Sequence, residues 1–210
     1  MRTQTPSKRL WILSLMGALV GWFALGLQFY VLRMQRDLSL FDSFVLYFSF
    51  FTILTNLLAA LTYTAGLITQ RSSFFRQNAT KTAIAACITV VGLVYQLVLR
   101  SLWTPTGWHQ VADELLHSFL PLYFLVFWWL TLDGQTLSWR KVWPWLLYPF
   151  GYLIAVMIRG QITGEYPYPF LNVGQQGWAR VGWNCLVLLG VFLGFFAFFW
   201  WMGRWKIRRT

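Results

Sequence analysis

Long runs of apolar residues, separated by short polar stretches, dominate the hydrophobic pattern of this chain. A membrane-spanning helix needs about 20 mostly apolar residues, and six segments come close to that length. Each run is continuous, whereas the strands of a membrane barrel alternate in polarity. The pattern therefore predicts an all-α membrane protein in which residues 1–210 form a single domain of six transmembrane helices. The predicted spans are Leu10–Leu32, Phe44–Ile68, Thr82–Trp103, Ala112–Leu132, Val142–Ile158 and Val181–Met202.

The composition supports a membrane protein. Of the 210 residues, 58% are hydrophobic and only 11% are charged. A soluble domain of this size needs a charged surface, and this chain has too few charged residues to supply one. The lipid bilayer is therefore the expected solvent, and the short loops leave no room for an attached soluble domain.

The distribution of charge predicts the orientation of the spans. If the N-terminus is cytoplasmic and six spans alternate, most lysines and arginines fall on the cytoplasmic side, while Asp133 is the single acidic residue there. An excess of basic residues marks cytoplasmic loops, so both termini are predicted to be cytoplasmic. The net charge of +11 does not indicate nucleic-acid binding, because no nucleic-acid module is recognisable. We expect the basic segment Arg204–Arg209 to contact anionic membrane lipids instead.

Four polar residues fall at a similar depth within different predicted spans. Thr52 lies about eight residues into its span, or roughly 12 Å deep, and His117 about five residues, or roughly 8 Å. Gln96 and Asn184 are expected at a comparable depth in their own spans. Asn56 follows Thr52 by one helical turn and lies on the same face. An ionisable residue inside a span, such as His117, is energetically costly and therefore indicates function. The shared depth of the four residues predicts that they line one polar cavity in the outer half of the bundle.

This set of side chains is suited to nucleophilic catalysis. A hydroxyl such as that of Thr52 becomes a useful nucleophile when a nearby base accepts its proton. Imidazole is the common base, which gives His117 this role. Asp113 and Glu114 precede His117 by four and three residues, so either could orient the ring. The candidates for stabilising an oxyanion are Arg159, Asn184 and Gln96. The prediction is acyl transfer or ester hydrolysis on a lipid-like substrate, with no cofactor.

Structural interpretations of the same residues stay open. Thr52 or its neighbour Thr55 could bond its own helix, and Asn56 and His117 could join helices by hydrogen bonds. His109, Asp113 and His117 could line up along one helix face as metal ligands. The chain has only two histidines and no HExxH-type pattern, so we expect no metal site. The alternative function is non-catalytic binding or transport of a lipid or small molecule through the same cavity.

The segment Gln161–Gly177 combines prolines, aromatic residues and glycines. Residues that precede proline favour extended geometry, and glycines permit sharp turns. One interpretation is a rigid apolar plug above the outer cavity. The other is an interfacial loop whose Tyr166, Tyr168 and Phe170 lie among the lipid headgroups.

Three segments carry a resemblance to a known family. SFFTILTNLLAAL (Ser49–Leu61), LLHSFLPLYF (Leu115–Phe124) and YPFGYLIAVMIRGQITGEYPYPFLNV (Tyr148–Val173) resemble bacterial six-span proteins called Pr-six-Pr. These are similar to the androgen-induced and androgen-dependent membrane hydrolases of animals. The resemblance implies a bacterial inner-membrane protein and a threonine hydrolase of fatty-acid esters, with Thr52 and His117 at the positions of the family's threonine and histidine.

Overall fold

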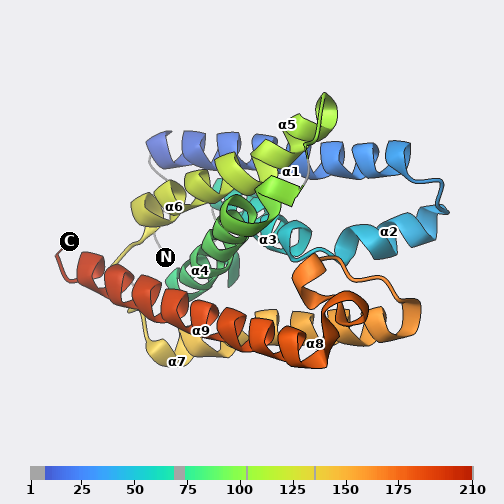
Figure 1. The fold of residues 1–210 in the computed structure, drawn as a ribbon. Helices are drawn as coiled ribbons and strands as arrows, with labels where there is room; N and C mark the ends of the chain where they lie inside the picture. Colours follow the sequence, from blue (N-terminus) through green and yellow to red (C-terminus); the bar gives the residue numbers. More distant parts are fainter. Residues whose placement is uncertain (1–7, 69–73, 103, 135, 210) are drawn as a thin grey trace.

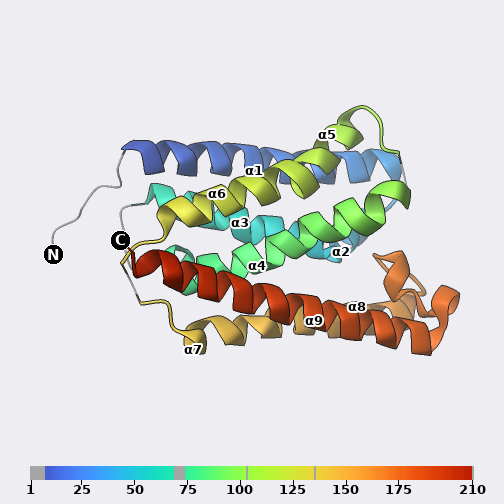
Figure 2. The same cartoon turned by 60° about the vertical axis from the view of Figure 1, so that its left-hand side comes forward.

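All regular secondary structure in residues 8–68, 74–102, 104–134 and 136–209, which the computed structural model describes, is helical. The all-α class expected from the apolar runs is therefore confirmed for these residues. The long helices run alongside one another, and α1 begins at the end of the bundle where α9 finishes (Figures 1 and 2). In chain order the elements are α1 (Lys8–Gln35), α2 (Leu40–Phe48), α3 (Phe51–Leu67), η1 (Phe74–Arg76), α4 (Asn78–Val94), η2 (Tyr95–Leu99), η3 (Arg100–Leu102), α5 (Trp108–Glu114), η4 (Leu115–Phe119), α6 (Leu120–Thr131), α7 (Trp139–Val142), η5 (Trp143–Leu146), α8 (Leu147–Thr163), η6 (Pro169–Leu171) and α9 (Val173–Ile207).

Five helical stretches are long and apolar enough to cross a membrane, and the bent pair α2–α3 makes a sixth if it counts as one span. Large apolar side chains face outward along them; on α9, Trp183, Leu186 and Trp201 are each more than 60% exposed. An apolar surface of this kind is unfavourable in water and favourable in lipid. The helices are thus compatible with an integral membrane protein. The five stretches are Lys8–Gln35, Asn78–Leu102, Trp108–Thr131, Trp139–Thr163 and Val173–Ile207.

The second predicted span is interrupted, which corrects the expectation of one helix over Phe44–Ile68. The axes of α2 and α3 differ by 83°. Phe50 between them is extended (φ −92°, ψ 126°). The Oγ of Ser49 donates to the Leu46 carbonyl (2.6 Å), and the Ser49 carbonyl accepts from the Tyr152 hydroxyl (2.8 Å). Side-chain hydrogen bonds thus stabilise the break between α2 and α3. The sequence has no proline or glycine at this point that would indicate it.

Other helix limits also differ from the predicted ones. The last helix starts at Val173 rather than Val181 and contains a non-helical residue, Gly177, with φ 75°. Only glycine adopts this backbone conformation readily, so the helix turns there. The fifth helical stretch continues to Thr163, which shortens the expected irregular segment. Trp103, the predicted end of the third span, lies outside the described residues.

Helix α4 lies at the centre of the bundle, between α3 and α6 on one side and α9 on the other (Figure 2). Its residues Ala83, Ala85 and Ala86 are fully buried. Small side chains allow neighbouring backbones to approach closely, which is how helices associate in membranes. The indole of Trp128 on α6 donates to the Oγ1 of Thr82 (3.0 Å) and satisfies its polar atom inside this core.

Helices α1 and α3 are packed through two glycines spaced four residues apart. A Cβ at Gly17 would lie 2.7 Å from the ring of Tyr63, which is fully buried. A Cβ at Gly21 would lie 3.3 Å from the Cβ of Ala60. The absence of side chains at Gly17 and Gly21 therefore sets the distance between the two helices, as small residues do where membrane helices pack together.

We predict that Gly17→Ala lowers the thermal unfolding midpoint in detergent relative to Gly26→Ala. Both changes add the same methyl group to α1 and gain about 1 kcal/mol of helix propensity. Gly26 has open space around it, whereas the new Cβ at position 17 overlaps the Tyr63 ring. Overpacking of this kind costs about 1–3 kcal/mol. Equal midpoints for the two variants would contradict the proposed α1–α3 contact.

Candidate active site

The break between α2 and α3 places Thr52 at the beginning of a helix. Thr52 is the second residue of α3. The first N–H groups of a helix have no partner within it. Here the Ile53 N–H bonds the Phe50 carbonyl, while the Thr52 N–H points to the hydroxyl of Tyr168 (3.4 Å). The side chain of Thr52 is buried, so its hydroxyl and its N–H both lie inside the protein.

His117 lies in the middle of η4, a wide π-helical turn between α5 and α6. Pro121 has no N–H and cannot bond the carbonyl of His117 four residues earlier. The Leu120 N–H bonds the Leu115 carbonyl instead, which is the five-residue spacing of a π turn. Gly92 on α4 packs against this turn, where a Cβ would lie 3.3 Å from the His117 carbonyl oxygen. Proline and glycine together bring the imidazole toward α3.

Thr52, His117 and Asp113 form a continuous hydrogen-bonded chain. The Nε2 of His117 lies 3.2 Å from the Oγ1 of Thr52. Its Nδ1 lies 2.9 Å from the Asp113 carbonyl and 3.1 Å from the Asp113 Oδ1. Both partners of Nδ1 are acceptors, so Nδ1 carries the proton of the neutral ring. The unprotonated Nε2 then faces the Thr52 hydroxyl, which is the arrangement that a general base requires.

Tyr95 fixes this chain from a second side. Its ring stacks on the imidazole of His117, with centroids 4.3 Å apart and planes at 14°. Its hydroxyl donates to the Oδ2 of Asp113, which leaves Oδ1 for His117. The residue begins the second π turn, η2, and is almost fully buried. A single side chain thus orients both the imidazole of His117 and the carboxylate of Asp113.

Asn56 connects Thr52 to the helix that carries His117. Its Nδ2 donates to the Thr52 carbonyl (2.9 Å) on its own helix and to the Leu116 carbonyl (3.1 Å) on η4. Leu116 directly precedes His117, so this buried amide fixes the relative position of Thr52 and His117. Asn56 is therefore a supporting residue whose hydrogen bonds are made to backbone rather than into a cavity.

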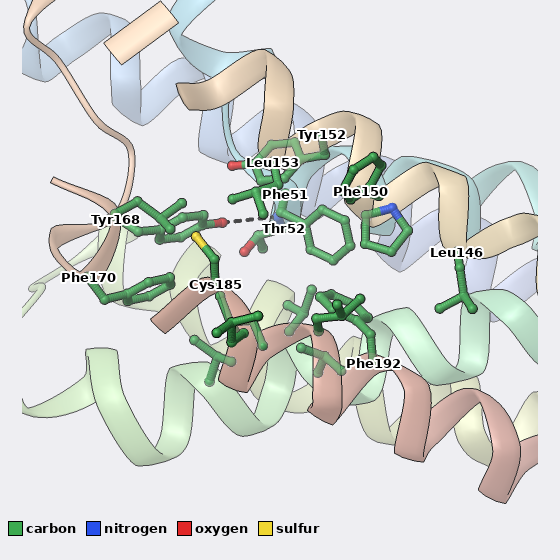
Figure 3. A pocket seen from close by; sticks show the side chains of 18 of the residues that line it. Phe51, Thr52, Leu146, Phe150, Tyr152, Leu153, Tyr168, Phe170, Cys185 and Phe192 are labelled. Carbon is green, nitrogen blue, oxygen red and sulfur yellow. Dashed lines mark hydrogen bonds between the residues drawn. The ribbon is translucent and has the colours of Figure 1, made fainter. Parts of the chain in front are cut away.

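Two cavities meet at Thr52. The first, of about 250 Å³, is lined mainly by apolar and aromatic side chains of α4, α8 and α9, such as Phe150 and Phe192, together with Phe51 of α3 (Figure 3). The second, of about 330 Å³, contains His117 and Asp113. Thr52, Leu99 and Tyr168 line both cavities. A molecule that occupied both cavities would therefore pass beside Thr52.

Tyr168 reaches the junction from the segment between α8 and α9 (Figure 3). Its ring stacks on Phe170 with centroids 5.2 Å apart, and it meets Phe50 edge to face at 6.2 Å. The Nδ2 of Asn184 on α9 donates to the Phe170 carbonyl (2.8 Å) and holds the segment in place. Tyr168 lines both cavities, as the plug interpretation of the proline-rich segment expects.

The expected polar layer is divided in the structure. Gln96 lies on the exposed side of η2, where its Nε2 donates to Ser118 (2.8 Å) and its Oε1 accepts from Arg100 (2.7 Å). Glu114 pairs with the same Arg100 and accepts from Ser118. Neither Gln96 nor Glu114 lines the two cavities at Thr52. These residues form a separate network, and of the two predicted acids it is Asp113 that contacts His117.

Two further predicted residues also lie away from the junction. Arg159 pairs with Glu165 at 3.2 Å, and the hydroxyl of Tyr166 accepts from the Nε2 of Gln161 at 2.6 Å. The ring of Tyr166 packs directly over Gly160. Arg159 and Tyr166 thus stabilise the end of α8 rather than facing Thr52.

The structure distinguishes between alternatives that the sequence left open. The Oγ1 of Thr55 lies 3.0 Å from the hydroxyl of Tyr148, so it is Thr52 that faces His117. The Nδ1 of His109 lies 2.8 Å from the Nε2 of Gln35. Across the described ranges, no group of three or more histidine, cysteine or acidic side chains is arranged to hold a metal ion.

Comparisons with known proteins add no assignment. No family model matches the chain, and searches of curated proteins and of solved structures give no significant match. The geometry around Thr52 is therefore the basis for the functional conclusion.

We predict that the neutral imidazole of His117 carries its proton on Nδ1. The measurement is the ¹⁵N spectrum of ¹⁵N-histidine-labelled protein in detergent, recorded over a series of pH values and read for the neutral form of the ring. His109→Gln leaves His117 as the single histidine and makes the assignment direct. A proton on Nε2 would contradict the hydrogen-bonded chain, because Nε2 could then not accept the Thr52 proton.

Proposed function

We propose that this protein is an intramembrane ester hydrolase that acts on lipid or fatty-acid esters, with Thr52 as the nucleophile and His117 as the general base. The observation that carries the proposal is the chain Thr52–His117–Asp113 at the junction of two cavities. Nucleophile, base and orienting carboxylate in mutual contact are the recurring arrangement of hydrolases that form acyl-enzymes.

The proposed setting is a bacterial inner membrane, with both termini in the cytoplasm and the site in the outer half of the bundle. The basic residues near the end of α9 support this orientation, since positive charge marks the cytoplasmic side. The start of α1 lies at the same end of the bundle (Figure 2). The likeness of three segments to the Pr-six-Pr proteins points to the same setting and to the same two residues.

The first half of the proposed reaction forms an acyl-enzyme. The Nε2 of His117 removes the proton of the Thr52 hydroxyl while Oγ1 attacks the ester carbonyl carbon. Asp113 stabilises the resulting imidazolium through Nδ1. The C–O bond to the alcohol then breaks, and Nε2–H returns the proton to the leaving alcohol. The acyl group remains on Thr52 as an ester.

Water completes the proposed reaction. His117 Nε2 accepts a proton from a water molecule, whose oxygen attacks the acyl-Thr52 carbonyl carbon. The bond to Oγ1 breaks and Thr52 recovers its proton from His117. The products are a carboxylic acid and an alcohol, and the protein returns to its starting state. No redox partner or cofactor enters this balance.

The cavities support a lipid-like ester as the substrate. The cavity walled by α4, α8 and α9 has an almost entirely apolar lining, which suits an acyl chain. The second cavity has polar residues in its lining, namely Gln28, Asp113 and His117. A leaving alcohol in this cavity would be near His117, which protonates it in the proposed reaction. The same apolar cavity could hold a lipid without reaction, and the following experiment separates these two functions.

We predict that purified protein in detergent cleaves members of a panel of 4-nitrophenyl and glycerol esters with differing acyl lengths. Thr52→Ala should lower kcat by about 10³-fold or more, because the attacking oxygen is lost. His117→Ala should lower it by about 10²–10⁴-fold, because general-base assistance is lost. Initial rates and thermal unfolding midpoints are measured together for every variant.

Thr55→Ala is the matched control, since Thr55 lies one turn along α3 and its hydroxyl contacts Tyr148. It should retain the kcat of the wild type within about threefold. Full activity of folded Thr52→Ala or His117→Ala protein would overturn the assigned roles. If the wild type binds these esters and cleaves none, the site is a lipid-binding or transport site.

A further inference from the structure

We propose that the backbone N–H of Thr52 and the hydroxyl of Tyr168 together bind the carbonyl oxygen of the ester and stabilise the oxyanion that forms on it. This inference rests on the proposed hydrolase function and adds a residue to its chemistry. Sequence reasoning gave the oxyanion role to Arg159, Asn184 or Gln96, and none of these side chains reaches Thr52.

The first donor is created by the break in the second span. An N–H in the middle of a helix is used by the carbonyl four residues earlier, whereas the N–H groups of the first turn are free for other acceptors. Because α3 begins at Phe51, the N–H of the nucleophile itself belongs to this first turn. The N-terminal end of a helix also carries partial positive charge, which favours an anionic oxygen there. A continuous helix over Phe44–Ile68 would have neither property.

The second donor lies close enough to act on the same oxygen. The Thr52 nitrogen and the Tyr168 oxygen are 3.4 Å apart. An oxyanion needs donors at about 2.7–3.1 Å. Two atoms 3.4 Å apart can both lie within that distance of a third, so one carbonyl oxygen beside the pair could accept from both donors. At 3.4 Å the present Thr52–Tyr168 contact is at the long end of hydrogen bonding, and a substrate oxygen can replace it.

The Tyr168 hydroxyl keeps its proton and is held in place. Burial raises the pKa of Tyr168 above its ordinary value of 10.0, so the group remains a donor through the neutral range. Stacking on Phe170 fixes the ring. Pro167 and Pro169 flank Tyr168 and restrict its backbone. A donor positioned before the reaction costs no reorganisation when charge develops on the substrate.

The cavities place the carbonyl at this pair of donors. Thr52 and Tyr168 line both cavities, whereas most other lining residues belong to one of them. An ester with its acyl chain in the apolar cavity and its alcohol beside His117 must pass the junction at its carbonyl group. The oxygen of that carbonyl then points to the two donors, while His117 lies on the side of the leaving alcohol.

Tyr168→Phe tests the proposal, because it removes the hydroxyl and keeps the ring that packs against Phe170. We expect kcat for the best ester of the panel to fall by about 10²–10³-fold, with KM changed less than about threefold. Tyr166→Phe is the matched control: it lies on the same segment, and its hydroxyl contacts Gln161 rather than Thr52. This control should keep the kcat of the wild type.

A second readout separates a lost oxyanion donor from a disturbed fold. Alkylboronic acids form tetrahedral adducts on nucleophilic hydroxyls and mimic the transition state, whereas a non-cleavable ether of the same chain mimics the bound substrate. Tyr168→Phe should weaken inhibition by the boronic acid about 10²-fold and leave inhibition by the ether within about threefold of the wild-type value. A merely structural role would weaken both inhibitors.

The outcomes distinguish this proposal from the function on which it rests. Thr52-dependent hydrolysis with an undiminished kcat in Tyr168→Phe overturns the oxyanion role and leaves the hydrolase in place. Equal weakening of both inhibitors also overturns it, since Tyr168 would then only shape the site. Absence of hydrolysis by the wild type overturns both proposals.

Discussion

The hydrogen bond between the Nε2 of His117 and the Oγ1 of Thr52 is the interaction on which the candidate site depends. It joins α3 to the turn between α5 and α6, two regions separated by 65 positions in the chain. In an apolar environment, a buried polar group without a partner is costly, so the contact is favoured once both helices are in place. The His117 side of this hydrogen bond is fixed by Asp113 and Tyr95, and the Thr52 side is fixed by Asn56.

Departures from regular helix make this contact reachable. The 83° bend after α2 places the Thr52 N–H at a helix start, where it bonds Tyr168 rather than a carbonyl of its own helix, and His117 lies in the π turn before Pro121. Tyr95 begins the second π turn and covers the imidazole. Each departure removes ordinary helical hydrogen bonds, and in an apolar environment the loss of backbone hydrogen bonds is energetically costly. π turns inside α-helices often occur at functional sites, and both of these surround the same histidine.

The sequence predicted what depends on hydrophobic length and helical spacing. Apolar runs indicate the spans, and the shared depth of Thr52 and His117 anticipates their contact. Helical spacing offered Asp113 and Glu114 as alternatives for orienting the imidazole, and Asp113 is the one in contact with it. The break at Ser49 could not be predicted, because it contains no proline or glycine and is held by the hydroxyl of Ser49 itself and by that of the distant Tyr152. The depth of a residue in a span also does not determine the direction in which its side chain points around the helix axis. For that reason Gln96 was expected to line the cavity, whereas its side chain lies on the exposed side of η2.

The most direct test of the account is to locate the site of covalent modification by an alkyl fluorophosphonate, a reagent that phosphonylates activated hydroxyls. Peptide mass spectrometry after labelling of the intact protein in detergent identifies the modified residue. The account predicts a single modified hydroxyl at Thr52, with labelling lost in His117→Ala and retained in Thr55→Ala. Modification at another residue, or labelling of Thr52 that persists without His117, would contradict the account.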